Sequence, residues 1–227
     1  RIPRSLRALP RNALAALRTR TYLRGATVTC FAFAGLFAYI AASAFLIQSV
    51  LGLSAIAYAI VFGLNGCGLI AASMLTARMS RRWAAQHVMA IGLGVEATGA
   101  AVVLVTALTG SVSAATLLPG LFLIACSMGF LFAPATSYAL HGQRHVAGTA
   151  LAVLGAVQFL AAGLVAPLVE LGGDEDPIPF AIVVTACVAM AWVCWIVFRE
   201  KSGRAPREDV RHRIGVPKTE RERYGQA

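Results

Sequence analysis

The sequence predicts an all-helical membrane protein whose chain crosses the bilayer six times. Six apolar stretches of 20 or more residues follow one another, and a helix needs about 20 apolar residues to cross roughly 30 Å of hydrocarbon. Of the 227 residues, 58% are hydrophobic and 13% are charged, whereas about a quarter of a soluble domain is charged. The basic residues occur only in alternate connections between the stretches. Together these observations favour a multi-pass membrane protein.

The charge pattern also predicts the orientation of the chain. All 20 lysines and arginines lie before the first stretch or directly after the second, fourth and sixth, in groups of 7, 3, 1 and 9. Because short connections rich in Lys and Arg stay in the cytoplasm, we expect both termini to be cytoplasmic. The net charge of +10 therefore reflects membrane orientation, and we expect no nucleic-acid partner.

Each element follows from its composition. Segment 1–24 carries seven arginines and no acid, so we expect either a basic cytoplasmic linker or an amphipathic helix on anionic headgroups. A transmembrane bundle at 25–198 should precede a disordered cytoplasmic tail at 199–227, where charge is mixed and apolar content is low. The six spans are expected at 25–48, 54–76, 83–108, 114–140, 146–169 and 177–198. Ser54 is the predicted N-cap of the second span.

These spans should be helices, because backbone groups in hydrocarbon must bond within their own segment. They are also too long for the strands of a membrane barrel. Pro134 frees a backbone carbonyl inside the fourth span and predicts a kink there, either a structural bend or a hinge.

Glu96 is the one charged residue deep inside a predicted span. It lies about 20 Å along the helix from Trp83. A charged carboxylate at that depth costs roughly 2.5 kcal/mol or more, so we expect the group to be protonated or paired inside the bundle. It is either a titrating or substrate-contacting acid, or a neutral carboxyl hydrogen-bonded to a neighbouring helix.

Residues for catalysis or metal binding are poorly placed. The five cysteines all fall within apolar stretches, which is typical of small buried side chains. The four histidines lie near predicted cytoplasmic ends or in the tail. We find no metal-ligand cluster, phosphate-binding loop or in-membrane Ser–His arrangement, and we expect neither an enzyme nor a metal site.

Several segments resemble a known transporter family. The stretch from Phe37 to Gln48, the turn Gly52-Leu53-Ser54 and Phe62-Gly63-Leu64-Asn65 look like the first two helices of a C-terminal half in the Bcr/CflA drug-resistance branch of the major facilitator superfamily. Residues 147–159 are similar to that branch's penultimate helix. The segment from Gly68 through Arg78, Arg81 and Arg82 resembles the degenerate second copy of the superfamily's loop motif. Ala44 departs from the branch, where we would expect proline.

The resemblance implies a fold and a function. The fold would be one half of a major facilitator transporter: six transmembrane helices as two inverted three-helix repeats, with the missing N-terminal six-helix half as partner. The function would be proton-coupled multidrug or small-molecule efflux by alternating access, in a bacterial inner (plasma) membrane, with the proton gradient as driving force and no cofactor. The alternatives are a metabolite facilitator of the same superfamily and a non-transporting six-span membrane subunit.

The resemblance also implies which residues face the substrate. The candidates for one wall of the central cavity combine aromatic, methionine and amide side chains: Tyr39, Ser43, Gln48, Asn65, Met128, Phe130, Tyr138 and Gln158. Such a surface suits bulky, amphipathic, often cationic small molecules. Arg78, Arg81 and Arg82 would belong to a cytoplasmic gating loop.

Overall fold

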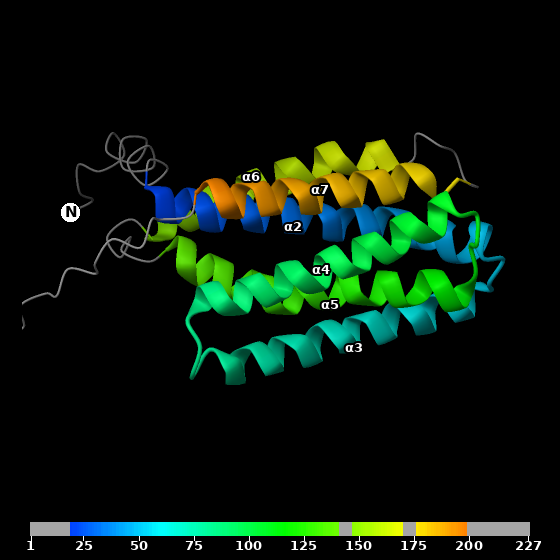
Figure 1. Cartoon of the computed structure of the whole chain (residues 1–227), viewed down its shortest axis with the longest axis horizontal. Helices are drawn as coiled ribbons and strands as arrows, with labels where there is room; N and C mark the ends of the chain where they lie inside the picture. Colours follow the sequence, from blue (N-terminus) through cyan, green and yellow to red (C-terminus); the bar gives the residue numbers. More distant parts are fainter. Residues whose placement is uncertain (1–18, 141–146, 170–175, 199–227) are drawn as a thin grey trace, which may run out of the picture.

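The computed structural model describes residues 19–140, 147–169 and 176–198 (Figure 1). This part of the chain contains six helices that are long and apolar enough to cross a membrane, and it contains no strand. They are α2 (Arg20–Phe45), continued by the π-helical turn η1 (Leu46–Val50), α3 (Ala55–Met79), α4 (Ala85–Leu108), α5 (Ala114–Ala139), α6 (Ala147–Val169) and α7 (Ile178–Val197). The all-helical prediction is confirmed. The predicted tail and residues 1–18 of the predicted leader lie outside the described residues.

The helix ends show why the chain turns where it does. Ser54 caps α3 as predicted, since its Oγ accepts a hydrogen bond from the Ala57 amide at 3.2 Å. Just before α7, Asp176 accepts a hydrogen bond from the Ile178 amide at 2.9 Å, although the N-cap of that helix is Pro177. Gly52 and Gly110 adopt φ angles of +63° and +65°, a conformation that glycine reaches without strain. The connections that precede α3 and α5 are therefore short and sharply turned.

Helix α2 begins at Arg20, five residues before the predicted start of the first span. Tyr22 and Arg24 thus belong to the bundle and not to the leader, and both side chains are buried. The arginines of segment 1–24 had placed both residues in the cytoplasmic leader, but a long side chain near a helix end can bury its stem along apolar neighbours.

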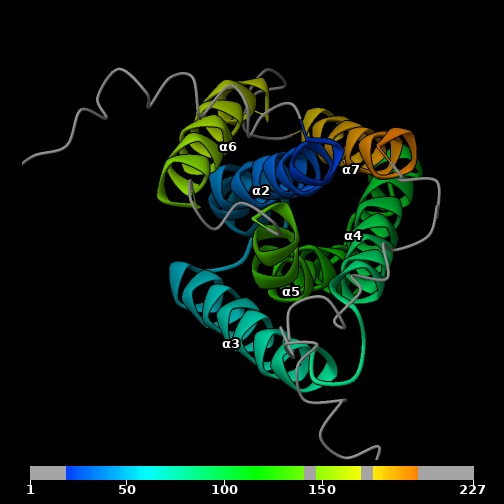
Figure 2. The same ribbon diagram turned by 90° about the vertical axis from the view of Figure 1, so that its left-hand side faces the viewer.

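The six helices pack as two interlocked groups of three. In the end-on view (Figure 2), α2 and α5 lie at the centre, with α6 and α7 beside α2, and α3 and α4 beside α5. Along the chain, α2, α3 and α4 form one three-helix unit, and α5, α6 and α7 form the other. The first helix of each unit packs on the second and third helices of the other unit. This exchange is the arrangement expected of two structural repeats, and it agrees with one half of a major facilitator fold.

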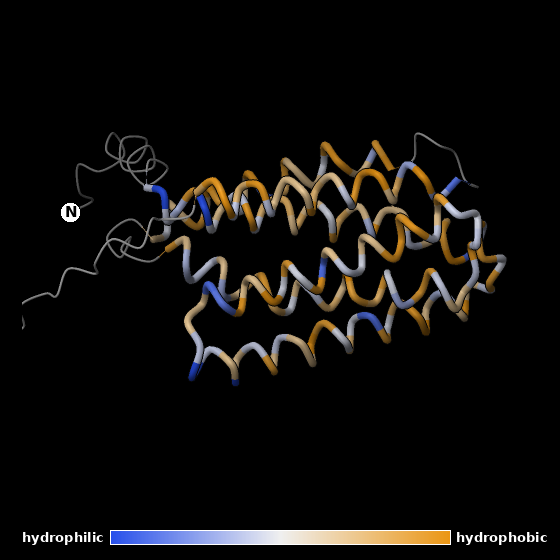
Figure 3. Tube along the Cα trace, viewed as in Figure 1, coloured by the Kyte–Doolittle hydropathy of each residue, from blue (hydrophilic) through white to orange (hydrophobic). Residues whose placement is uncertain are grey.

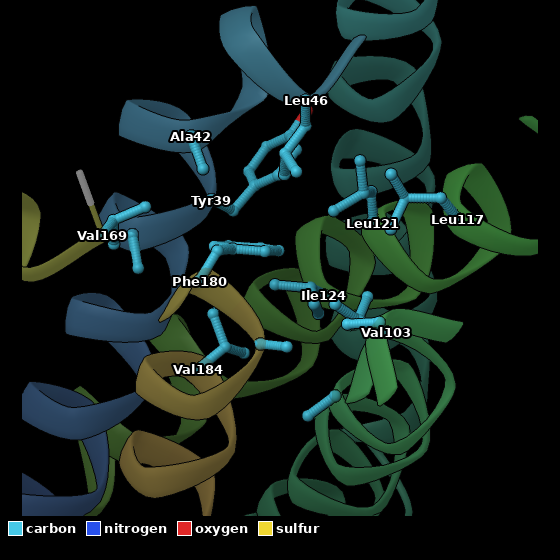
Figure 4. Packing of buried hydrophobic residues seen from close by; sticks show 14 of the residues in the cluster. Tyr39, Ala42, Leu46, Val103, Leu117, Leu121, Ile124, Val169, Phe180 and Val184 are labelled. Carbon is cyan, nitrogen blue, oxygen red and sulfur yellow. The ribbon is translucent and has the colours of Figure 1, made fainter. Parts of the chain in front are cut away.

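The largest buried cluster lies where α2, α4, α5 and α7 meet (Figure 4). Leu46, Leu121 and Phe180 are fully buried in it. Figure 3 shows apolar positions in all the described helices, and large apolar side chains such as Phe159 and Leu164 are exposed, as expected where lipid replaces water around the bundle. Close helix contact therefore depends on small residues rather than on hydrophobicity.

Candidate functional site

The helices divide the bundle into a closed side and an open side. On one side α4 and α7 pack directly against each other. On the other, α3 and α6 diverge, with α2 and α5 between them (Figure 2). The side chains predicted to contact substrate lie on α2, η1, α3, α5 and α6, the helices that frame the open side.

Four phenylalanines form an aromatic patch that joins three of these helices. Phe33 and Phe37 on α2 lie 5.2 and 5.9 Å, ring centre to ring centre, from Phe159 on α6, both edge to face. Phe33 also lies 6.5 Å from Phe132 on α5. Phe132 is 48% exposed and Phe159 is 63% exposed. The patch therefore presents ring faces and edges to whatever lies beside it.

A polar network connects α2 to α3. The Asn65 amide donates a 2.7 Å hydrogen bond to the Tyr39 hydroxyl, and both side chains are buried. The Ser43 hydroxyl donates to the Ile40 carbonyl at 2.8 Å and lies 3.4 Å from the Tyr58 hydroxyl. The ring of Tyr39 stacks on Phe62 with centres 6.1 Å apart. Three predicted cavity residues, Tyr39, Ser43 and Asn65, are thus brought together.

Asn65 also borders a groove between α3 and α5. Its volume is about 470 Å³, and its other lining residues are apolar: Val61, Leu64, Ala114, Leu118, Pro119 and Phe122. A second groove of about 370 Å³ lies nearer the other end of the same helix pair and carries the hydroxyl-bearing residues Ser73, Thr76, Ser80 and Ser137. The first groove has the size and lining to suit an apolar group with few polar contacts, whereas the second offers several hydroxyls.

The other predicted cavity residues are dispersed. Gln48 lies half-buried in η1. Gln158 is buried on α6, and its Nε2 has no hydrogen-bond partner among the described residues. Met128 is buried in an apolar cluster, and Phe130 packs beside Gly92 of α4. The fifth, Tyr138, lies near the end of α5. The structure therefore does not gather all eight predicted residues at one point.

Sequence reasoning missed a buried arginine. Arg24 is 4% exposed, and its guanidinium lies 3.5 Å from the centre of the Trp195 ring of α7 and 5.8 Å from that of Tyr138. Its terminal NH donates to the Tyr138 hydroxyl at 3.5 Å. Two residues earlier, the Tyr22 hydroxyl donates to the Ala150 carbonyl of α6 at 2.8 Å. These contacts tie the start of α2 to α5, α6 and α7. The sequence did contain a signal for this buried arginine, because the aromatic residues Tyr138 and Trp195 lie near the ends of two later spans.

The residues of the predicted loop motif fall into two groups. Arg78, Arg81 and Arg82 are exposed where α3 leads into α4. They lie at the same end of the bundle as the start of α2 (Figure 1), and we call this the basic end. Gly68 instead lies within α3, where an added Cβ would come within 2.5 Å of Phe122 and 2.6 Å of the Cys126 sulfur. Gly68 therefore permits close packing of α3 on α5.

Glu96 lies inside the bundle as predicted, with 1% of its side chain exposed. A Cβ at Gly35 of α2 would lie 3.1 Å from its Oε1. Its Oε2 has no hydrogen-bond partner among the described residues. No group of three or more metal-binding side chains occurs within the part of the chain that the structure describes.

Comparisons with known proteins place the chain in a family. Residues 2–167 match the Major Facilitator Superfamily. The chain is 28% identical over 190 residues to the uncharacterized MFS-type transporter YdgK of Bacillus subtilis, covering 83% of this chain and 47% of that protein. It is 25% identical over 198 residues to a bicyclomycin resistance protein homolog of Haemophilus influenzae, covering 84% and 48%. The chain spans about half the length of these relatives. It belongs to the Major Facilitator Superfamily of multi-pass membrane transporters.

Proposed function

We propose that this chain acts as the C-terminal half of a proton-coupled efflux transporter for multiple drugs or other small molecules. It forms one wall of a central cavity, and an N-terminal six-helix half forms the other. The observation that carries the proposal is the open side of the bundle, where exposed aromatic rings and buried amides lie on the helices that frame it. The likeness to a bicyclomycin resistance homolog supports an efflux role within the superfamily.

The chemistry of the open side suits a bulky, largely apolar substrate. The aromatic patch offers stacking and edge contacts that tolerate many ring shapes. The amides of Asn65 and Gln158 provide few hydrogen bonds, and no lysine or arginine belongs to the patch. Neutral or cationic aromatic compounds therefore fit better than anions, because an anion would gain no charged partner there.

Alternating access requires two halves that rock around a shared site. In this proposal, substrate leaves as protons enter from outside, across a bacterial inner membrane, and both termini of this chain lie in the cytoplasm. The orientation can be tested with single cysteines at Ser80 and Ser111 in a cysteine-free chain. An impermeant thiol reagent added outside intact cells should label position 111 and spare position 80. The reverse pattern would overturn the orientation.

Transport is tested with the complete gene product in everted membrane vesicles. Bicyclomycin uptake driven by an imposed pH gradient, and abolished by a protonophore, is the expected result. Uptake that does not depend on the pH gradient would instead favour a metabolite facilitator. Absence of uptake for this and a panel of aromatic cations would favour a non-transporting subunit.

A matched pair of variants links transport to the aromatic patch. Phe159→Ala removes a ring that is 63% exposed and touches Phe33, whereas Leu160→Ala truncates its neighbour, which is 64% exposed. We expect Phe159→Ala to lower drug uptake at least severalfold, and Leu160→Ala to leave it nearly unchanged. Equal effects of the two substitutions would contradict the assignment of the patch to the substrate cavity.

A further inference from the structure

The carboxyl of Glu96 occupies a junction of three helices. It projects from α4 toward Gly35 of α2, where a Cβ would lie 3.1 Å from Oε1. The same Cβ position lies 3.8 Å from the Cβ of Cys187 on α7. The carboxyl therefore fills the space that the missing side chain of Gly35 leaves open, and α2 contacts it closely.

The surroundings of this carboxyl are apolar. The neighbouring residue Leu93 belongs to one buried hydrophobic cluster, and Ala97 packs against another. Oε2 is buried and has no hydrogen-bond partner among the described residues. Arg78, Arg81 and Arg82 are exposed at the basic end, and Arg24 is stacked on Trp195. A carboxylate ion here would be a buried charge without a partner, which is strongly unfavourable.

We propose that Glu96 is a proton-binding site of the folded bundle, and that its neutral carboxyl is what allows α2 to pack against α4 and α7. Loss of the proton to water would leave a negative charge beside the α2 backbone, so this packing would loosen. The inference concerns the folded chain and does not depend on the proposed transport function. It gives a role to Glu96, a buried acid that is not among the residues proposed to line the substrate cavity.

Within the described helices, few other titratable groups face this carboxyl. On α7 it faces the thiol-bearing residue Cys187. On α2 it faces Gly35, and the nearest titratable side chains along that helix are Cys30 and Tyr39, whose hydroxyl is bonded to Asn65. Helix α5 meets α4 at residues that do not titrate: Gly120, Ile124 and Leu131. Cys187 is therefore the side chain whose removal serves as a control.

The first test detects the proton directly. The other nine acidic residues all lie in segments 170–176 and 199–227, which connect or follow the spans, so Glu96 is the one acid within a predicted span. Infrared spectra of the full 227-residue chain in lipid nanodiscs, after subtraction of the spectrum of empty nanodiscs, should show one protonated carboxyl band at pH 7. That band should disappear in Glu96→Gln and persist in Cys187→Ala. A wild-type spectrum without the band, or one unchanged by Glu96→Gln, would overturn the proposal.

The second test measures the consequence for folding. If the folded chain holds a proton that the unfolded chain releases, stability must fall as pH rises, because ∂ΔG/∂pH takes the sign of protons bound unfolded minus folded. For one proton, the unfolding equilibrium constant should rise about tenfold per pH unit near neutrality. Glu96→Gln should remove this slope, and Cys187→Ala should retain it.

The wild-type slope is decisive even if one variant misfolds. A wild-type chain whose unfolding is independent of pH between 6 and 8 would contradict the proposal whatever the Glu96→Gln chain does. If the slope is present and Glu96→Gln fails to assemble, the Cys187→Ala chain still shows whether the slope depends on the neighbouring thiol. A slope that vanishes in Cys187→Ala would mean that the carboxyl of Glu96 alone does not produce it, and would overturn the proposal.

Discussion

Replacing Gly129 by alanine should weaken the attachment of α3 to the bundle. An added Cβ at this position would lie 2.6 Å from the Leu69 carbonyl oxygen, 2.7 Å from the Ala72 Cβ and 2.8 Å from the Ser73 amide nitrogen. Two of these atoms belong to the backbone of α3, so no rotamer change can relieve the contact. The first distance is 0.8 Å short of the 3.4 Å at which ordinary contact begins, so the helices must separate.

The expected magnitude follows from two opposing effects. Overpacking of this kind typically costs 1–3 kcal/mol, while replacing glycine by alanine within a helix returns about 1 kcal/mol. The net loss of unfolding free energy relative to the wild-type chain should therefore be about 0 to 2 kcal/mol. The effect should centre on α3, because that helix packs mainly on α5 and has few other contacts to hold it.

Gly66→Ala is the matched control. Gly66 lies on the same pair of packed helices, but an added Cβ there would meet nothing within 4 Å. Reversible unfolding of the two purified variants in mixed detergent micelles should show Gly129→Ala destabilised, and Gly66→Ala unchanged or stabilised by up to about 1 kcal/mol. If Gly129→Ala is as stable as Gly66→Ala, α3 and α5 do not approach as closely as described.

Two further substitutions test contacts that tie α2 to its neighbours. Trp195→Leu removes the ring beneath the buried guanidinium of Arg24 and should cost about 2 kcal/mol of unfolding free energy; an equal loss from Trp83→Leu, an exposed tryptophan, would contradict this. Tyr39→Phe leaves the buried amide of Asn65 without its acceptor and should cost roughly 1–3 kcal/mol. A double-mutant cycle with Asn65→Leu should show that the two losses are not additive, and additive losses would mean that the bond contributes nothing.

The fold was largely predictable because the bilayer imposes simple demands. Length, apolar content and the alternation of basic residues identified all six spans, and Ser54 marked the start of α3. The main discrepancy was the start of α2, because arginines at positions 20 and 24 looked cytoplasmic. Trp195 and Tyr138 contact the buried guanidinium of Arg24, and those partners lie more than 100 residues away along the chain.

The candidate site was much less predictable. Tyr39, Ser43 and Asn65 were predicted from a family resemblance and do lie together, but Met128 and Phe130 turned out to lie within the packed bundle. The aromatic patch was not recognised as a unit, since its four rings come from three helices. Whether these residues contact a substrate is a proposal that the transport experiments test.

Membrane spans could be predicted from the sequence, whereas the packing between helices could not, for a physical reason. In a soluble protein, the apolar face of a helix points to the core, so periodicity in the sequence shows which side is buried. In a membrane bundle, lipid and core are both apolar, and periodicity no longer separates them. The sequence therefore predicted six membrane spans and their orientation, and the described residues form six helices long and apolar enough to cross a membrane. Only the tertiary structure shows that the carboxyl of Glu96 packs against Gly35, that α3 packs against Gly129, and that the guanidinium of Arg24 lies over the ring of Trp195.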